Sequence, residues 1–319
     1  MNMIKLFGLV SALVLAGCCV PNQEKAAVSF RVLYWNIQNG MWDGQRDDYA
    51  RFVAYVKEMK PDLCVWCEAE SIWQTDTPTN YIPKANRYLP NGWPELAARY
   101  GHTNVFLGGH RDNYPQVVTS RLPIEGVKRI VGPKEKPVCH GAGWSVVKVA
   151  GREINLVTLH TYPHLHAPGA KDVKKSRAEH GGDFYRRYEV EEVCRETILT
   201  HTNGANECWM MMGDFNSLSP VDNPFYQKDP KDPCFLAQSF VREATPYRDI
   251  IAERHPGQLV TSTYGMKRID YVYLTPPLAA SVKSAEIPMD GYSAPQNIPG
   301  CEFKSPSDHR PIVVDFEFR

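Results

Sequence analysis

The sequence predicts a single α+β domain, built from many short β-strands and fewer helices. Short apolar runs recur along the chain and end abruptly in polar residues, which is the pattern of core strands. Other segments space their apolar residues three or four apart, as amphipathic helices do. The 319 residues contain neither an internal repeat nor a composition change that would mark a linker, so we expect one domain.

The most apolar predicted strand, 209–212, is followed directly by Gly213 and by the polar residues Asp214 and Asn216. We expect the glycine to end this strand, so that the following loop presents the polar groups. The other predicted strands span 30–35, 63–67, 116–124, 144–149, 153–159, 268–274 and 312–318. The strands at 144–149 and 153–159 flank Ala150-Gly151-Arg152 and should form a hairpin.

Helices are predicted where apolar residues keep helical spacing, at 46–60, 94–100, 184–200 and, in two pieces, 235–253. Pro61 stops the first of these helices, and Pro246 divides the last. The remainder of 71–115 is predicted to be a long, irregular insertion. Residues 161–183 are polar and punctuated by Pro and Gly, so we expect a surface loop that serves as a lid or a binding loop.

The N-terminus carries the pattern of an export signal. Lys5 precedes an apolar run from Leu6 to Leu15, which is too short to span a membrane. The run ends in Leu15-Ala16-Gly17-Cys18, which resembles a bacterial lipoprotein cleavage box and implies lipidation of Cys18. Ordinary secretion is the alternative.

These observations divide the chain into three parts. Residues 1–17 are predicted to be a lipoprotein signal peptide, 18–28 a tether, and 29–319 the folded domain. The protein should therefore be exported and held by its lipid on the periplasmic or cell-surface side of a bacterial membrane.

Charge and cysteine content exclude few functions. With 36 basic and 36 acidic residues the formal net charge is zero, which argues against a protein coated in positive charge for bulk nucleic-acid binding. A basic excess is confined to 121–187, where 13 Lys or Arg outnumber 6 Asp or Glu. Cys64 and Cys67 should face opposite sides of their strand, so they are interpreted as core thiols rather than as a metal pair.

Polar side chains suited to one chemistry follow six separate predicted strands or lie at their ends. They are Asn36, Glu68, His160, Asp214 with Asn216, Asp270, and Asp308 with His309. Each alone is explained equally well as a turn residue. Together they provide hard oxygen ligands, which suit Mg²⁺ or Mn²⁺ better than a structural zinc, and two imidazoles suited to attack of water on phosphorus.

With these residues the chain resembles the endonuclease/exonuclease/phosphatase superfamily, which includes deoxyribonuclease I, abasic-site endonucleases, bacterial sphingomyelinases and inositol polyphosphate 5-phosphatases. The motifs that carry the resemblance are Trp35-Asn36-Ile37, Pro61-Asp62-Leu63 with Glu68, 119–124, Thr158-Leu159-His160, Gly213-Asp214-Phe215-Asn216, 268–271 and Ser307-Asp308-His309. The resemblance implies a four-layer α/β/β/α sandwich of two packed, mixed, mostly antiparallel β-sheets, with the site at one edge of the sheets.

The resemblance also implies a role for each polar residue. Glu68 is expected to be the principal ligand of Mg²⁺ or Mn²⁺, with Asn36 close by and Asp308 reaching a metal directly or through water. Asp214 should orient or deprotonate the attacking water, and Asn216 should hold a phosphoryl oxygen.

Two histidines complete the expected site. His309, steered by Asp270, should face the scissile phosphate, and His160 should contact the phosphate or assist the leaving group. Abasic-site endonucleases usually have Tyr at the position of His160, so the chain looks more like the nuclease, lipase and phosphatase branches.

The resemblance predicts a metal-dependent hydrolase of phosphate esters but leaves its substrate open. A nucleic acid or nucleotide ranks first, and a phospholipid or a sugar or inositol phosphate follows closely. A non-catalytic binding protein on the same scaffold is a further alternative. Arg121, Lys174 and Arg186 are candidates for contact with substrate phosphate, although a solvated surface explains them as well. We expect a monomer.

Overall fold

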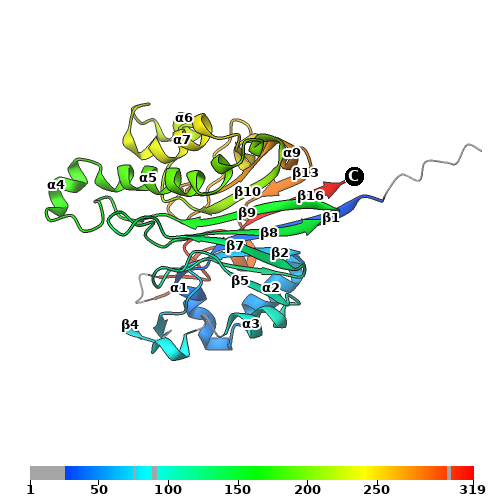
Figure 1. Ribbon diagram of the computed structural model, residues 1–319. Helices are drawn as coiled ribbons and strands as arrows, with labels where there is room; N and C mark the ends of the chain where they lie inside the picture. The colour runs from blue at the N-terminus through cyan, green and yellow to red at the C-terminus, as the bar shows by residue number, and fades with distance from the viewer. Residues whose placement is uncertain (1–25, 75–76, 88–91, 300–302) are drawn as a thin grey trace, which may run out of the picture.

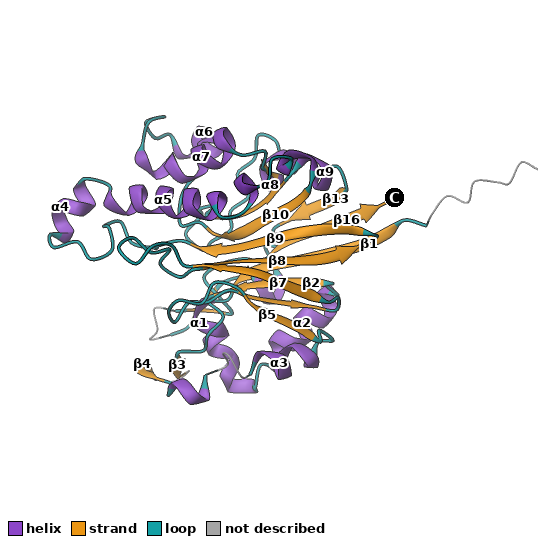
Figure 2. Cartoon of the chain, in the orientation of Figure 1, coloured by secondary structure: helices purple, strands orange, loops and turns teal. Residues whose placement is uncertain are grey.

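Two six-stranded β-sheets pack face to face, and helices cover the outer face of each sheet (Figures 1 and 2). This computed structural model describes residues 26–74, 77–87, 92–299 and 303–319, so the predicted signal peptide and Cys18 lie outside the described residues. The layers confirm the predicted four-layer α+β sandwich.

Each sheet contains one parallel strand pair among antiparallel neighbours. The order in the first sheet is β13 (Val282–Glu286), β16 (Ile312–Phe318), β1 (Val28–Asn36), β2 (Leu63–Cys67), β6 (Val117–Ser120) and β5 (Asn104–Leu107). The order in the second is β11 (Arg248–Asp249), β12 (Asp270–Leu274), β10 (Cys208–Asp214), β9 (Arg152–His160), β8 (Ala142–Val149) and β7 (Ile124–Ile130). The parallel pairs are β1–β2 and β9–β10.

The central strands are apolar throughout because both of their faces are buried. In β2, Val65 faces the core between the two sheets, whereas Trp66 faces the core beneath the helices. This alternation also separates Cys64 from Cys67, which are buried and free in different cores. The interpretation of both as core thiols is confirmed.

Amphipathic helices supply the outer layers. The helices α2 (Ala50–Met59) and α3 (Trp93–Arg99) pack on the first sheet, and α5 (Gly181–Arg195) and α7 (Leu236–Ala244) pack on the second. Shorter helices lie in the connections: α1 (Gln38–Met41), α4 (Val173–Ala178), α6 (Asn223–Tyr226), α8 (Ile250–Arg254) and α9 (Pro276–Ala279). No helix in the described part of the chain is both long and apolar enough to cross a membrane.

The structure corrects three predicted boundaries. The single strand predicted at 116–124 is two strands in different sheets, because the chain crosses from β6 to β7 around Pro123. The first helix begins at Ala50, after a 3₁₀ turn at Trp42–Asp47. The loop predicted at 161–183 contains α4 and the start of α5, which extend past the ends of the strands (Figure 1).

Gly213 does not end its strand, contrary to the prediction, because β10 continues through it to Asp214. The glycine is required by the neighbouring strand: a Cβ at this position would lie 1.9 Å from the Leu159 carbonyl oxygen of β9. The missing side chain therefore lets β9 and β10 run side by side up to the residues that they deliver.

Gly213→Ala is expected to lower the free energy of unfolding by about 3 kcal/mol, since the added methyl group must push β9 and β10 apart. Urea denaturation measures the change. Gly265→Ala is the matched control, because its Cβ would meet only Thr263 Oγ1, at 3.8 Å. Equal stability of the two variants would contradict the steric explanation.

Candidate active site

The strand ends bring the predicted polar residues to one edge of the sandwich. In the first sheet, β1 ends at Asn36 and Glu68 follows its parallel neighbour β2. In the second sheet, the parallel neighbours β9 and β10 end at His160 and Asp214. Because β12 is antiparallel to β10, it instead begins at this edge with Asp270, the register partner of Asp214. His309 precedes β16, which is likewise antiparallel to β1.

Glu68 is held by one donor from the end of β1 and one from the turn that follows. Its Oε2 accepts the Asn39 backbone N–H at 3.1 Å, and its Oε1 lies 3.3 Å from the Asn36 amide nitrogen. The same amide nitrogen lies 3.1 Å from Asp214 Oδ2, so it links carboxylates from the two sheets. Burial raises the pKa of Glu68, and the charge of Asp308 raises it further. A cation at Glu68 would relieve both effects.

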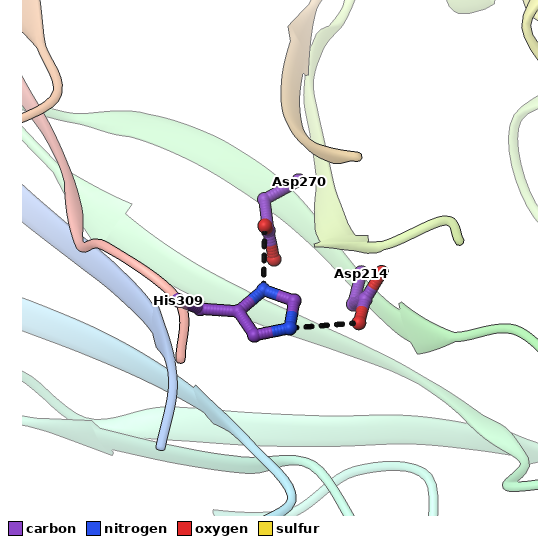
Figure 3. Close-up of side chains that lie close together, drawn as sticks. All are labelled: Asp214, Asp270 and His309. Carbon is purple, nitrogen blue, oxygen red and sulfur yellow. Dashed lines mark hydrogen bonds and ion pairs between the residues drawn. The ribbon is translucent and has the colours of Figure 1, made fainter. Parts of the chain in front are cut away.

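His309 and Asp270 form a buried hydrogen-bonded pair. His309 Nδ1 lies 2.8 Å from Asp270 Oδ2, while Tyr34 and Ser262 donate to the same carboxylate at 2.6 and 2.7 Å. Burial opposes protonation of His309, but Asp270 and Asp308 outweigh it and raise the pKa of the imidazole well above its usual range. These carboxylates therefore favour the protonated imidazole, whose Nε2 points at Asp214 from 3.8 Å (Figure 3).

Asp214 lies between the groups that the two sheets contribute. Burial and the nearby Asp270 raise the pKa of its carboxyl to about 7, so it can exchange a proton near neutral pH. Its Oδ1 accepts the Asn216 backbone N–H at 2.8 Å. The Asn216 side chain donates one amide hydrogen to the Thr161 carbonyl at 3.0 Å, which leaves the second amide hydrogen for another acceptor.

His160 completes the group as a neutral imidazole. Its Nε2 lies 3.7 Å from Asp214 Oδ2 and 4.0 Å from Glu68 Oε1. Burial, followed by the charges of His140 and His309, lowers the pKa of His160 well below its usual value. Both of its ring nitrogens are buried and lack a hydrogen-bond partner among the described residues. An unsatisfied polar group in this position suits a ligand.

Comparison with known proteins identifies the family. A family model described as the Endonuclease/Exonuclease/phosphatase family matches residues 33–309, which include every strand end described above. The protein belongs to the Endonuclease/Exonuclease/phosphatase family. Comparison with curated protein sequences gives no match.

Solved structures share the fold of this family member. An AP endonuclease from Archaeoglobus fulgidus is 18% identical with a TM-score of 0.61, covering 90% of this chain and 99% of its own. The catalytic domain of human Nocturnin with bound sulfate is 14% identical with a TM-score of 0.57, and the match covers 92% of this chain and 97% of the Nocturnin chain. An endonuclease/exonuclease/phosphatase from Beutenbergia cavernae is 19% identical with a TM-score of 0.56, covering 91% and 72%.

Membership in the Endonuclease/Exonuclease/phosphatase family implies hydrolase activity of the phosphoesterase or nuclease type, and enzymes of this family use divalent metals. The carboxylates around Glu68 fit such an ion, because the raised carboxyl pKa and the nearby charge of Asp308 favour a hard cation with oxygen ligands. Asp214, Asp270 and His309 also offer ligand atoms within 4.8 Å of one another. Three hydrogen bonds already hold Asp270, however, which leaves this carboxylate less free to bind a metal.

The structure adds one residue to this family site that sequence patterns did not reveal. His140 stacks on His160 with ring centroids 4.3 Å apart, and its Nδ1 lies 2.7 Å from Asp112 Oδ2. Burial opposes its protonation, but Asp112 raises the pKa of His140 above its usual value. No strand or helix pattern surrounds His140, so only its spatial contact with His160 identifies it.

The three predicted substrate-binding residues do not join the cluster. Arg121 forms an ion pair with Asp62, which precedes β2 and therefore lies at the opposite end of that strand from Glu68. We therefore withdraw Arg121 from the site. Lys174 is exposed on α4, beyond the strand ends. Arg186 is buried and donates to the Tyr162 and His164 carbonyls, so it braces the loop after His160.

Glu189 of α5 fixes the two histidine loops. Its carboxylate oxygens accept the Cys139 N–H at 2.7 Å and the Tyr162 N–H at 2.8 Å. Burial raises the pKa of Glu189 from 4.5 to about 7, although these two N–H groups, His140 and Arg186 all favour ionisation. The folded protein therefore binds a proton here that the unfolded chain releases.

Between about pH 4.5 and pH 7, Glu189 should make the free energy of unfolding decrease with rising pH, by about 3 kcal/mol at most. The sign follows because the folded state holds more protons than the unfolded state in this window. Glu189→Gln should remove that contribution to the slope, and Glu192→Gln should retain it. Urea denaturation across this pH range measures both, and parallel profiles would contradict the assignment.

Proposed function

We propose that the protein is an exported, metal-dependent phosphodiesterase that uses water to cleave phosphate esters. The observation that carries the proposal is the meeting of Glu68 with Asp214 and the His309–Asp270 pair at one sheet edge. Glu68 and Asn36, with Asp308 nearby, would hold Mg²⁺ or Mn²⁺. When bound, such an ion neutralises charge that develops on the phosphoryl oxygens.

The remaining groups divide the chemistry of hydrolysis. Asp214 orients a water and accepts its proton as the water oxygen bonds to phosphorus, which its raised pKa permits near neutral pH. The cationic His309, held by Asp270, and the free amide hydrogen of Asn216 donate to phosphoryl oxygens. The neutral His160 donates a hydrogen bond to the phosphate or to the departing ester oxygen. The departing ester oxygen takes up a proton from solvent as its bond to phosphorus breaks, so a diester gives a phosphate monoester and an alcohol.

A nucleic acid or nucleotide is the substrate class that we favour. The likeness to an AP endonuclease structure and the basic excess at 121–187 support it. Because binding to a phosphate backbone releases counterions, a nuclease should lose activity steeply as the salt concentration rises. Weak salt dependence on a small phosphate ester would instead favour the phospholipid or sugar and inositol phosphate alternative.

The deciding experiment is a hydrolysis panel on the chain from about Gln23 onward. The panel contains plasmid DNA, RNA, sphingomyelin, inositol polyphosphates and a generic phosphodiester, each with Mg²⁺, Mn²⁺ or chelator. We expect one class to be cleaved, with activity lost in chelator and restored by the metal. A folded, metal-loaded protein that cleaves none of them would favour the non-catalytic binding protein.

We also propose lipid attachment at Cys18 and a monomeric state. The Leu15-Ala16-Gly17-Cys18 box supports the first, and a site built entirely from one chain supports the second. Cys18→Ser should move the protein from the membrane to the soluble fraction of a bacterial host. Unchanged fractionation would contradict lipid anchoring, and sedimentation of the soluble chain tests its oligomeric state.

A further inference from the structure

A cavity of about 390 Å³ adjoins the candidate active site at Asn216. Part of its lining comes from the segment between β9 and α5, including Arg177 of α4 and His180, and from the start of α5. Another part comes from the segments that carry Lys228 and Lys267. A volume of this size suits part of a small ligand, and Asn216 places that ligand beside the reacting group.

The walls of this cavity carry more positive than negative charge. Arg177, Arg186, Lys228 and Lys267 line it together with two carboxylates. Both carboxylates are already paired: Asp183 lies 2.5 Å from Arg186, and Asp232 lies 3.0 Å from Lys228. Arg177 and Lys267 are exposed, and within the described ranges their side chains take part in no ion pair. These two cations are therefore available to an anionic ligand.

Arg186 gives the cavity a fixed charge. Its side chain is 3% exposed, and three hydrogen bonds, to Asp183 and to the Tyr162 and His164 carbonyls, hold its terminal nitrogens. Its Nε is buried and has no hydrogen-bond partner in the described part of the chain. This buried N–H is an unsatisfied hydrogen-bond donor, and an anion in the cavity would satisfy it.

We infer that this cavity binds a second phosphate of the substrate, while the first is attacked beside Asp214. The inference rests on the proposed function, and it narrows the substrate to molecules that carry at least two phosphates. The apolar side chains of Leu165, Leu218 and Ile269 line the same cavity. They can contact the sugar or polyol ring that joins the two phosphates of the substrate. The second phosphate comes from the next nucleotide of a strand or from a polyphosphorylated ring.

The test compares substrates that differ by one phosphate. Thymidine 5′-(p-nitrophenyl phosphate) has one, and the same compound with a 3′-phosphate has two; inositol monophosphate and bisphosphate form the second arm. In at least one of the two pairs, the wild-type protein should give a higher kcat/KM for the compound with two phosphates. The pair that shows this preference identifies whether the second phosphate belongs to a nucleotide or to a polyphosphorylated ring. The Arg177→Ala, Lys267→Ala double variant should lower that ratio about tenfold.

Lys231→Ala is the matched control, because Lys231 is exposed on the same segment as Lys228 but does not line the cavity. It should keep the wild-type ratio. An unchanged ratio in the double variant would overturn the inference. If no ester is cleaved, the proposed function fails, but the second-phosphate site can still be tested by calorimetry with the two-phosphate compounds. The double variant should then bind these compounds about tenfold more weakly than the wild-type protein. Equal affinity would overturn the inference.

Discussion

Glu68→Gln is expected to lower kcat about a thousandfold with little change in stability. The substitution removes the charge that would hold a divalent cation, and loss of that cation removes roughly 4 kcal/mol of transition-state stabilisation. Stability should change little because burial already raises the pKa of Glu68, so a neutral side chain relieves a cost while it loses one hydrogen bond. Steady-state kinetics and thermal unfolding measure the two effects.

Metal titration separates this interpretation from a general loss of structure. Calorimetry with Mn²⁺ should show binding to the wild-type protein and at least tenfold weaker binding to Glu68→Gln. Glu58→Gln is the control, because Glu58 is an exposed carboxylate on α2. Wild-type turnover in Glu68→Gln would remove Glu68 from the site.

His309→Asn is expected to lower kcat by roughly a hundredfold to ten-thousandfold, which is the range for loss of a general acid or base. The Asn amide can replace Nδ1 as a donor to Asp270, but nothing replaces Nε2, which faces Asp214. The buried Asp270 should thus keep a partner in this variant. His309→Ala should be destabilised as well, by about 2 kcal/mol, because it removes one donor from that carboxylate.

The comparison between the two His309 variants distinguishes catalysis from folding. Both should lose activity, whereas only His309→Ala should show reduced stability in urea. His255→Asn is the control, because His255 lies away from the site and its Nε2 hydrogen-bonds to the Ala285 carbonyl instead. Substantial activity in His309→Asn would show that Nε2 takes no part in the reaction.

The central strands and the residues at their ends were predictable because burial leaves a strong pattern. An apolar run as short as 63–67 favours a buried strand by its length, and the polar residue that follows such a strand lies at the edge of the sheet. The roles of these residues came from the family resemblance. The edge strands β5 and β13 escaped prediction, since β13 has an exposed face and β5 lies in an irregular segment.

Contacts between distant loops were not predictable. Arg121 and Arg186 look alike in the sequence, yet one forms an ion pair at the far end of β2 and the other is buried beneath the loop after His160. Gly213 was misjudged because its role depends on the Leu159 carbonyl of a neighbouring strand, not on its own local conformation. His140 depends in the same way on a stacking partner twenty positions away.

The pairing of β1 with β16 sets when the protein can become active during its synthesis. Val28 pairs with Phe318, so β1 has no neighbour on one side until β16 has been made. His309 emerges only just before β16. Pairing at such sequence separation forms late and slowly. A nascent chain that already contains Glu68 and Asp214 therefore has an incomplete candidate site, which is completed only when β16 has paired with β1.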